Sequence, residues 1–229
     1  MFHTAIGVIC SNDLVHMELA KPCATNQLAD AIHQISHLSK NWLVEFQARH
    51  ISLNSVPIYT QPTRHTWKPP LSGTFKINFD GAIFPMEKKS GIGVVIRDSR
   101  GLVIASCSKV VHQVLGACDV EAMAAMLALA FASDVGVKRA VLEGDSMAVI
   151  LGLREDGKVL VPYELLLENA RLLSQQFDEL HYSHTKREGN SLAYSLARYA
   201  VSIPDFLVWM KDVPSQFYSV FQTDLSGFP

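Results

Sequence analysis

Lys76-Ile77-Asn78-Phe79-Asp80-Gly81-Ala82 alternates polar and apolar side chains, and this period of two predicts a β-strand over residues 74–82. The strand ends near an aspartate, Asp80. Two more carboxylates occupy comparable places, because Glu121 opens an alanine-rich helix and Asp145 follows a short apolar strand. Since each acid lies where a strand ends or a helix begins, we expect the three side chains to converge at one edge of a sheet.

Converging carboxylates repel one another unless cations lie between them, and hard oxygen ligands of this kind select Mg²⁺ or Mn²⁺. The leading interpretation of Asp80, Glu121 and Asp145 is therefore a metal-dependent site for phosphoryl transfer. Each acid alone has a plainer explanation, as a turn residue, a helix-dipole acid or a helix start. Those explanations do not predict three such acids in this order, so we prefer the metal site.

The elements around these acids have a recognisable order. The turn Asp98-Ser99-Arg100-Gly101 has residue types that suit a tight hairpin, so the strands on either side of it should pair antiparallel. The predicted elements are strands over 74–82, 91–97, 102–111, 139–143 and 179–186, and helices over 119–135, from 147, over 162–176 and over 191–201. This order indicates an α/β domain with a mixed sheet.

The composition excludes several classes of protein. The 229 residues, 48% of them hydrophobic, can bury one main core with an appendage. No apolar run approaches the ~20 residues that cross a bilayer, and the N-terminus lacks the basic start of a signal peptide, so we expect no membrane partner. The four cysteines form no Cys-x-x-Cys pair, which favours reduced thiols in an intracellular compartment, either nucleus or cytoplasm.

Residues 1–64 differ from the rest of the chain. Apolar side chains at helical spacing predict an amphipathic helix over 27–49. His33 and His37 would share a face of this helix, but the glutamate of a zinc hydrolase motif is missing between them, and surface histidines are the preferred interpretation. Prolines then indicate a linker that ends near Trp67. The predicted division is an N-terminal helical segment and linker over 1–64, a folded domain over 65–203 and a C-terminal tail over 204–229.

Five motifs resemble, in order and spacing, those of the ribonuclease H family. They are Asn78-Phe79-Asp80-Gly81-Ala82, Gly91-Ile92-Gly93-Val94-Val95-Ile96-Arg97-Asp98, Glu121-Ala122, Glu143-Gly144-Asp145-Ser146 and Arg187-Glu188-Gly189-Asn190. Trp67-Lys68-Pro69-Pro70, Trp209 and Pro214 are similar to the plant type, which is found in the reverse transcriptases of non-LTR retrotransposons and as free-standing proteins. The resemblance covers roughly residues 65–215.

This resemblance implies a ribonuclease H-like fold, with a five-stranded mixed sheet flanked by helices, and hydrolysis of the RNA strand in RNA–DNA hybrids by two Mg²⁺ ions. Asp80 would bridge both ions, Glu121 would hold one of them, and Asp145 would complete the shell. The net charge of −2 means that affinity for a polynucleotide must be local. Lys186, Arg187 and Asn190 are the expected nucleic-acid contacts.

The chain departs from the family pattern on its last predicted helix. Members carry a fourth ligand there, where this chain has Tyr194, and a neutral phenol adds no charge to a second ion site. Glu188 is a hypothetical replacement carboxylate, and His184 is a strand histidine for which a packed or solvated role is preferred. The alternative function is therefore a catalytically silent protein derived from a retroelement, which binds nucleic acid or is vestigial.

Overall fold

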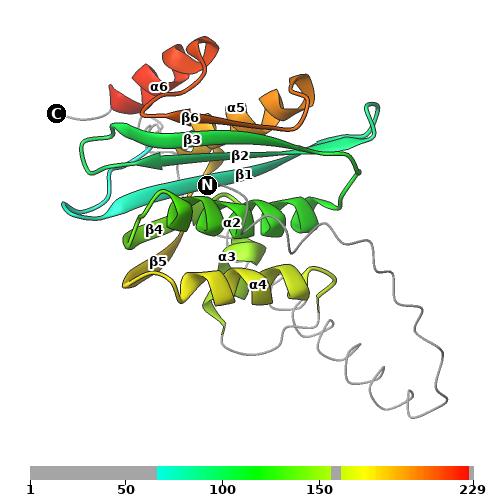
Figure 1. Ribbon diagram of the computed structural model, residues 1–229, viewed down its shortest axis with the longest axis horizontal. Coiled ribbons are helices and arrows are strands. Elements are labelled where there is room, and N and C mark those ends of the chain that lie inside the picture. The colour runs from blue at the N-terminus through cyan, green and yellow to red at the C-terminus, as the bar shows by residue number, and fades with distance from the viewer. Residues whose placement is uncertain (1–65, 156–160, 227–229) are drawn as a thin grey trace, which may run out of the picture. The chain divides into compact units, whose positions relative to one another are not determined.

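The computed structural model describes residues 66–155 and 161–226, which belong to one compact unit that begins at Arg64 (Figure 1). The expectations for residues 1–64, including the helix over 27–49 and the pair His33 and His37, lie outside the described residues. No helix in the described ranges is both long and apolar enough to cross a bilayer.

A mixed sheet of six strands forms the centre of this unit, in the order β5-β4-β1-β2-β3-β6. The antiparallel part consists of β1 (Phe75–Phe84), β2 (Lys89–Arg97), β3 (Val103–Val111) and β6 (Phe206–Met210). The strands that run parallel to β1 are β4 (Arg139–Gly144) and β5 (Glu179–His184). The predicted meander and mixed sheet are therefore confirmed.

Helices cover both faces of the sheet (Figure 1). One face carries α2 (Ala117–Asp134), α3 (Met147–Arg154) and α4 (Glu164–Ser174). The opposite face carries α5 (Ser191–Tyr199) and α6 (Tyr218–Leu225). Single turns of 3₁₀ helix lie at η2 (Arg187–Asn190), η3 (Ala200–Ser202) and η4 (Ser215–Phe217).

Neighbouring residues of the central strands serve two different cores, as the period of two requires. Val94 packs in the larger core, with side chains of α2 and α4, whereas Val95 packs in a smaller core with Leu192 and Leu196 of α5. Helix α2 lies between the sheet and α4, which explains why its alanines are buried on more than one side. The alanine-rich composition thus allows close packing on both of its sides.

Helix α5 lies directly on β2 because that strand has glycines beneath it. A Cβ atom on Gly93 would collide with the carbonyl oxygen of Ala193 and the amide nitrogen of Ala197, and one on Gly91 would collide with the Ala197 carbonyl oxygen. Alanine at either position would push the helix away from the sheet. These two glycines therefore fix the position of the helix that contains Tyr194.

The ribonuclease H-like fold is confirmed with one more strand than expected, and the boundary at residue 203 is corrected. We expected 204–229 to be a tail, but β6 pairs with β3 through residues 206–210. Further along, Asp224 is 3% exposed and forms an ion pair of 2.7 Å with Arg97 of β2. β6 escaped prediction because it has only five residues and leaves Leu207, Val208 and Met210 exposed, so burial does not impose a clear period.

Candidate metal centre

Asp80 and Asp145 lie at equivalent positions on two parallel strands. Pairing of β1 with β4 ends at Asn78 and Glu143, and each strand leads to an aspartate two residues later. Asp145 directly follows the end of β4, as expected. Asp80 does not end its strand, because β1 continues to Phe84 along β2. The parallel register, and not a strand end, therefore brings these two aspartates to the same level of the sheet.

Glu121 comes to the same place from α2, where it is the fifth residue and not the first as expected. The close approach of this helix depends on Gly81. A Cβ atom there would lie 2.8 Å from Cγ1 of Val120 and 3.1 Å from the amide nitrogen of Glu121. The absence of a side chain immediately after Asp80 thus lets the start of α2 pack against β1 and brings Glu121 next to Asp80.

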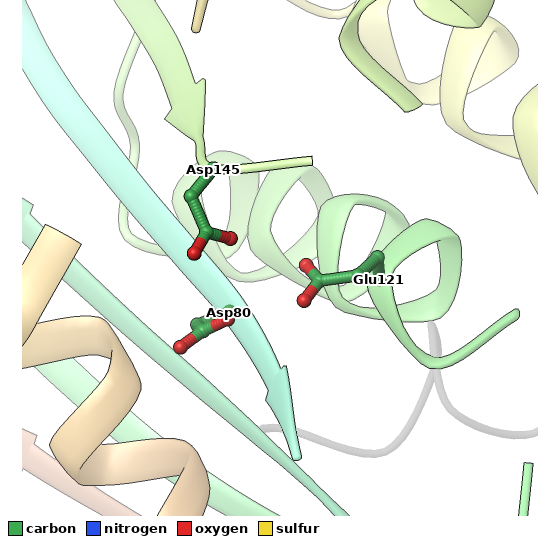
Figure 2. A group of neighbouring side chains, drawn as sticks. All are labelled: Asp80, Glu121 and Asp145. Atoms are coloured by element: carbon green, nitrogen blue, oxygen red, sulfur yellow. The ribbon is translucent and has the colours of Figure 1, made fainter. Parts of the chain in front are cut away.

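The three side chains point toward one another from β1, α2 and the end of β4 (Figure 2). One oxygen from each of Asp80, Glu121 and Asp145 lies within 4.8 Å of the other two. Asp80 Oδ2 and Glu121 Oε2 are buried without a hydrogen-bond partner, although buried carboxylate oxygens normally have one. A divalent cation would satisfy both atoms, so the donor set fits Mg²⁺ or Mn²⁺.

The pKa values of the cluster show that it is unfavourable to hold these acids together in their charged form without a cation. Burial, and then the charge of Asp145, raises the pKa of Asp80 to about 7. Burial, and then the charge of Asp80, raises the pKa of Glu121 to about 9. Both directions follow from the cost of holding like charges close together away from water. Without metal, both carboxyl groups therefore hold their protons to higher pH than ordinary carboxyl groups do.

Arg187 of η2 is the cation that lies against the cluster. Its Nε donates to Oδ2 of Asp145 at 3.1 Å, and its guanidinium carbon lies 4.9 Å from the centre of the Tyr194 ring. The Arg187 side chain is 62% exposed, whereas that of Asp145 is 12% exposed. Tyr194 thus contacts the arginine, and within the described residues the acid cluster has three members and no fourth.

The remaining predicted residues have different surroundings. Lys186 is exposed beside Arg187, where a nucleic-acid contact stays a prediction. The expectation for Asn190 is corrected, because this residue is 1% exposed and its Nδ2 donates to the carbonyl oxygen of Phe79 at 2.8 Å. Asn190 therefore ties η2 to β1 and is closed off from a ligand. Glu188 is exposed and does not join the acid cluster, so this chain's structure gives no support to a replacement ligand there.

His184, at the end of β5, lies beside the backbone of Asp145. Its Nε2 is 3.2 Å from the backbone carbonyl oxygen of Asp145, and the residue is half-buried. A ring nitrogen that donates to this carbonyl holds the backbone at Asp145 and does not offer a metal ligand. His184 is therefore packed at the edge of the site, in agreement with the preferred interpretation.

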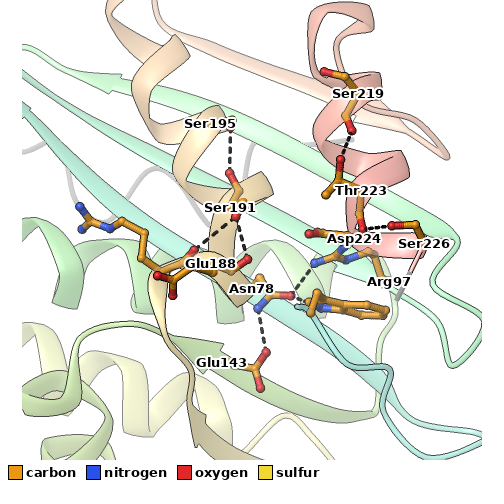
Figure 3. A network of polar contacts seen from close by, with 12 residues as sticks. Asn78, Arg97, Glu143, Glu188, Ser191, Ser195, Ser219, Thr223, Asp224 and Ser226 are labelled. Atoms are coloured by element: carbon orange, nitrogen blue, oxygen red, sulfur yellow. Dashed lines mark hydrogen bonds and ion pairs between the residues drawn. The ribbon is translucent and has the colours of Figure 1, made fainter. Parts of the chain in front are cut away.

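A buried polar network beneath the site was missed by the sequence reasoning (Figure 3). Oδ1 of Asn78 accepts from Trp67 Nε1 at 2.8 Å and from Arg97 at 3.1 Å, while Nδ2 of Asn78 donates to Glu143 at 3.1 Å. Arg97 is completely buried and stacks on the Trp67 ring at 3.8 Å. The motifs that contain Asn78, Arg97 and Glu143 were recognised in the sequence only for their resemblance to the ribonuclease H family. No local pattern in the sequence shows that these three residues contact one another.

The fold and the acid cluster together define a ribonuclease H-like domain. A family model described as reverse transcriptase-like matches residues 78–200, more than half of the chain, and the chain belongs to this family. A search of curated proteins found no significant match.

Solved structures agree with this class. RNase H1 from the halophilic archaeon Halobacterium salinarum is 27% identical, with a TM-score of 0.53 over 57% of this chain and 98% of that one. An N-terminal RNase H domain from Mycobacterium tuberculosis is 24% identical, with a TM-score of 0.52 over 56% of this chain and 94% of that one. LC11-RNase H1, solved with an RNA/DNA hybrid, is 22% identical, with a TM-score of 0.51 over 56% and 96%. At 24% and 22% identity, the last two structures show similarity of fold alone.

Proposed function

We propose that this protein hydrolyses the RNA strand of RNA–DNA hybrids with Mg²⁺ or Mn²⁺ held by Asp80, Glu121 and Asp145. The observation that carries the proposal is the pair of buried oxygens, Asp80 Oδ2 and Glu121 Oε2, that have no partner beside a third carboxylate. The resemblance implies two ions. Divalent cations held by these three carboxylates would supply the means to activate a water molecule and to stabilise the leaving oxygen of a phosphodiester.

The proposed substrate rests on the class of fold and on the charges beside the cluster. Arg187 is exposed and pairs with Asp145, and Lys186 is the exposed residue before it in the sequence, so we expect phosphates to approach here. One structural neighbour, LC11-RNase H1, was solved with an RNA/DNA hybrid. A domain of this kind recognises the 2′-hydroxyl groups and the shape of a duplex, so we expect little preference for base sequence.

A second candidate is a catalytically silent domain that binds nucleic acid. The observation in its favour is the ion pair of 3.1 Å between Arg187 and Asp145, because a guanidinium on this carboxylate competes with a metal ion. The substitution at Tyr194 points the same way, since the phenol contacts Arg187 and adds no acid to the cluster.

Cleavage of a labelled RNA strand by the purified full chain decides between the two candidates. The hybrid is tested with Mg²⁺ and with Mn²⁺, next to duplexes of RNA alone and of DNA alone, and Asp80→Asn is the matched control. Cleavage restricted to the hybrid and lost in Asp80→Asn would support the ribonuclease. A folded wild-type protein that cleaves nothing with either metal would refute the ribonuclease and leave the silent domain.

Metal binding can be measured separately from cleavage by thermal unfolding. A cation that binds only the folded protein raises the midpoint, with a stabilisation of about 2.7 kcal/mol at a hundredfold excess over the dissociation constant. We expect millimolar Mg²⁺ to raise the midpoint of the wild type and Asp145→Asn to reduce that rise. An unchanged midpoint in the wild type would count against the site.

A further inference from the structure

Arg187 gives the acid cluster a positive charge that belongs to the protein. It approaches Asp145 with Nε at 3.1 Å and leaves most of its side chain in water. Asp145 is thereby paired, whereas Asp80 and Glu121 each retain a buried oxygen without a partner. The three carboxylates are thus divided into one acid that already has a cation and two that lack one.

Tyr194 holds this arginine in place. Its ring lies 4.9 Å from the guanidinium carbon of Arg187, a distance at which a cation is attracted to the face of an aromatic ring. The ring projects from α5, whose position on β2 is fixed by Gly91 and Gly93. Tyr194 therefore gives the guanidinium a rigid support where an acid would have repelled neighbouring carboxylates and attracted a metal.

The charges of the site balance with one divalent cation and not with two. Three ionised carboxylates and one guanidinium leave two negative charges, which a single divalent ion neutralises. A second ion would leave an excess of two positive charges beside the buried Asp80, and like charges close to a buried group repel more strongly than they do in water. Within the described residues no further acid joins the cluster to offset that excess.

We propose that Arg187, supported by Tyr194, takes the place of a second metal ion. Asp80 and Glu121, whose buried oxygens lack partners, would then hold one divalent cation, and the guanidinium, paired with Asp145, would contact a phosphate oxygen of the substrate. An arginine suits this role because its planar guanidinium has five N–H donors whose geometry matches both carboxylate and phosphate, whereas a lysine is a point charge on a flexible stem. The inference rests on the proposed function, since it concerns the same metal site, and it replaces the two ions that the resemblance implies.

The test counts the Mn²⁺ ions bound to the full chain without substrate, by equilibrium dialysis followed with electron paramagnetic resonance. We expect one ion per wild-type chain. Arg187→Gln releases Asp145 and should allow a second ion to bind. Arg198→Gln is the matched control, because Arg198 is an exposed arginine that stacks on the Phe84 ring at 4.7 Å and should leave one ion. Tyr194→Ala removes the support of Arg187 and should shift binding in the same direction as Arg187→Gln.

Each outcome decides a specific point. Two ions in the wild type, or one ion of unchanged affinity in Arg187→Gln, would overturn the role of Arg187 while leaving the metal site in place. No Mn²⁺ in a folded wild-type protein would overturn the proposed function itself. A second readout is the binding of a hybrid in EDTA, where Arg187→Gln should weaken the affinity several-fold and lower its dependence on salt, whereas Arg198→Gln should change both much less.

Discussion

Asn78 donates a hydrogen bond of 3.1 Å to Oε1 of Glu143, and this contact joins β1 to β4 at the last pair of their parallel register. Asp80 and Asp145 each follow two residues later along their strands. The hydrogen bond between Asn78 and Glu143 therefore helps to place the two aspartates side by side. The second oxygen of Glu143 is used as well, in an ion pair of 2.9 Å with Lys76. A buried network with this many hydrogen bonds favours one arrangement of the region, although Nε of Arg97 is buried without a hydrogen-bond partner.

Asn78→Ala should lower the free energy of unfolding by about 2–4 kcal/mol, because it removes three buried hydrogen bonds, with Trp67, Arg97 and Glu143. Urea unfolding followed by circular dichroism measures the change. Ser133→Ala is the control, since it removes an exposed hydrogen bond to Gln176 and should cost less than about 0.5 kcal/mol. Equal effects of the two substitutions would contradict a central role for Asn78.

Gly81→Ala should weaken Mg²⁺ binding and lower stability by about 1–3 kcal/mol, because the new methyl group would collide with Val120 and displace the start of α2 that carries Glu121. The change in the thermal midpoint on adding Mg²⁺ is the measurement. Gly116→Ala is the control, because its Cβ would meet only the side chain of Asp119 at the exposed start of the same helix. A Gly81→Ala protein with wild-type Mg²⁺ binding would disprove the need for this close approach.

The stability of the protein without metal should fall as the pH rises. The folded protein binds protons on Asp80 and Glu121 more tightly than the unfolded chain, where their pKa values return to 3.8 and 4.5. Their contribution to the free energy of unfolding is therefore complete at pH values below the pKa values of the unfolded chain. It is lost as the pH rises through the folded-state pKa of about 7 for Asp80 and about 9 for Glu121.

Urea unfolding in EDTA between pH 4 and 9 tests this dependence, and the difference between wild type and Asp80→Asn isolates the cluster from other groups. We expect the variant to lose less stability with rising pH, and saturating Mg²⁺ to reduce the loss in the wild type. Parallel profiles of the two proteins in EDTA would refute the assignment of the titration to this pair.

Tyr194→Asp should raise the rate of RNA cleavage by about tenfold, which corresponds to about 1.4 kcal/mol of the barrier. The new carboxylate removes the support of Arg187 and adds a ligand for a second ion. Single-turnover cleavage of a hybrid at saturating Mg²⁺ is the measurement, and Tyr194→Phe, which keeps the ring, should behave as the wild type. An unchanged or lower rate in a folded Tyr194→Asp protein would reject this explanation.

Asp224→Ala should destabilise the domain by about 3–5 kcal/mol, because it leaves the guanidinium of Arg97 buried without its carboxylate. Thermal and urea unfolding both report the loss. Thr223→Ala, at an exposed position beside it, should change the stability by less than about 0.5 kcal/mol. A small effect of Asp224→Ala would contradict a stabilising role for its ion pair with Arg97.

The sequence by itself determined the central strands, the alanine-rich helix and the identities of the three acids. Local periods carry this information, because alternation in residues 76–80 defines a strand with Ile77 and Phe79 on one face, and the small residues of α2 define a helix that can pack close to a sheet. The motifs around Asp80, Glu121 and Asp145 also named the class of fold.

Only the tertiary structure decided how distant residues complete the site. Arg187 and Asp145 are 42 positions apart, Asn190 and the Phe79 carbonyl are 111 apart, and Arg97 and Asp224 are 127 apart. No local pattern reports such pairs, since each depends on the register of β1 with β4, on the seating of α5 over glycines, or on the pairing of β6 with β3. Residue types therefore set the elements, and contacts between elements decided which side chain reaches the metal site and which is buried beneath it.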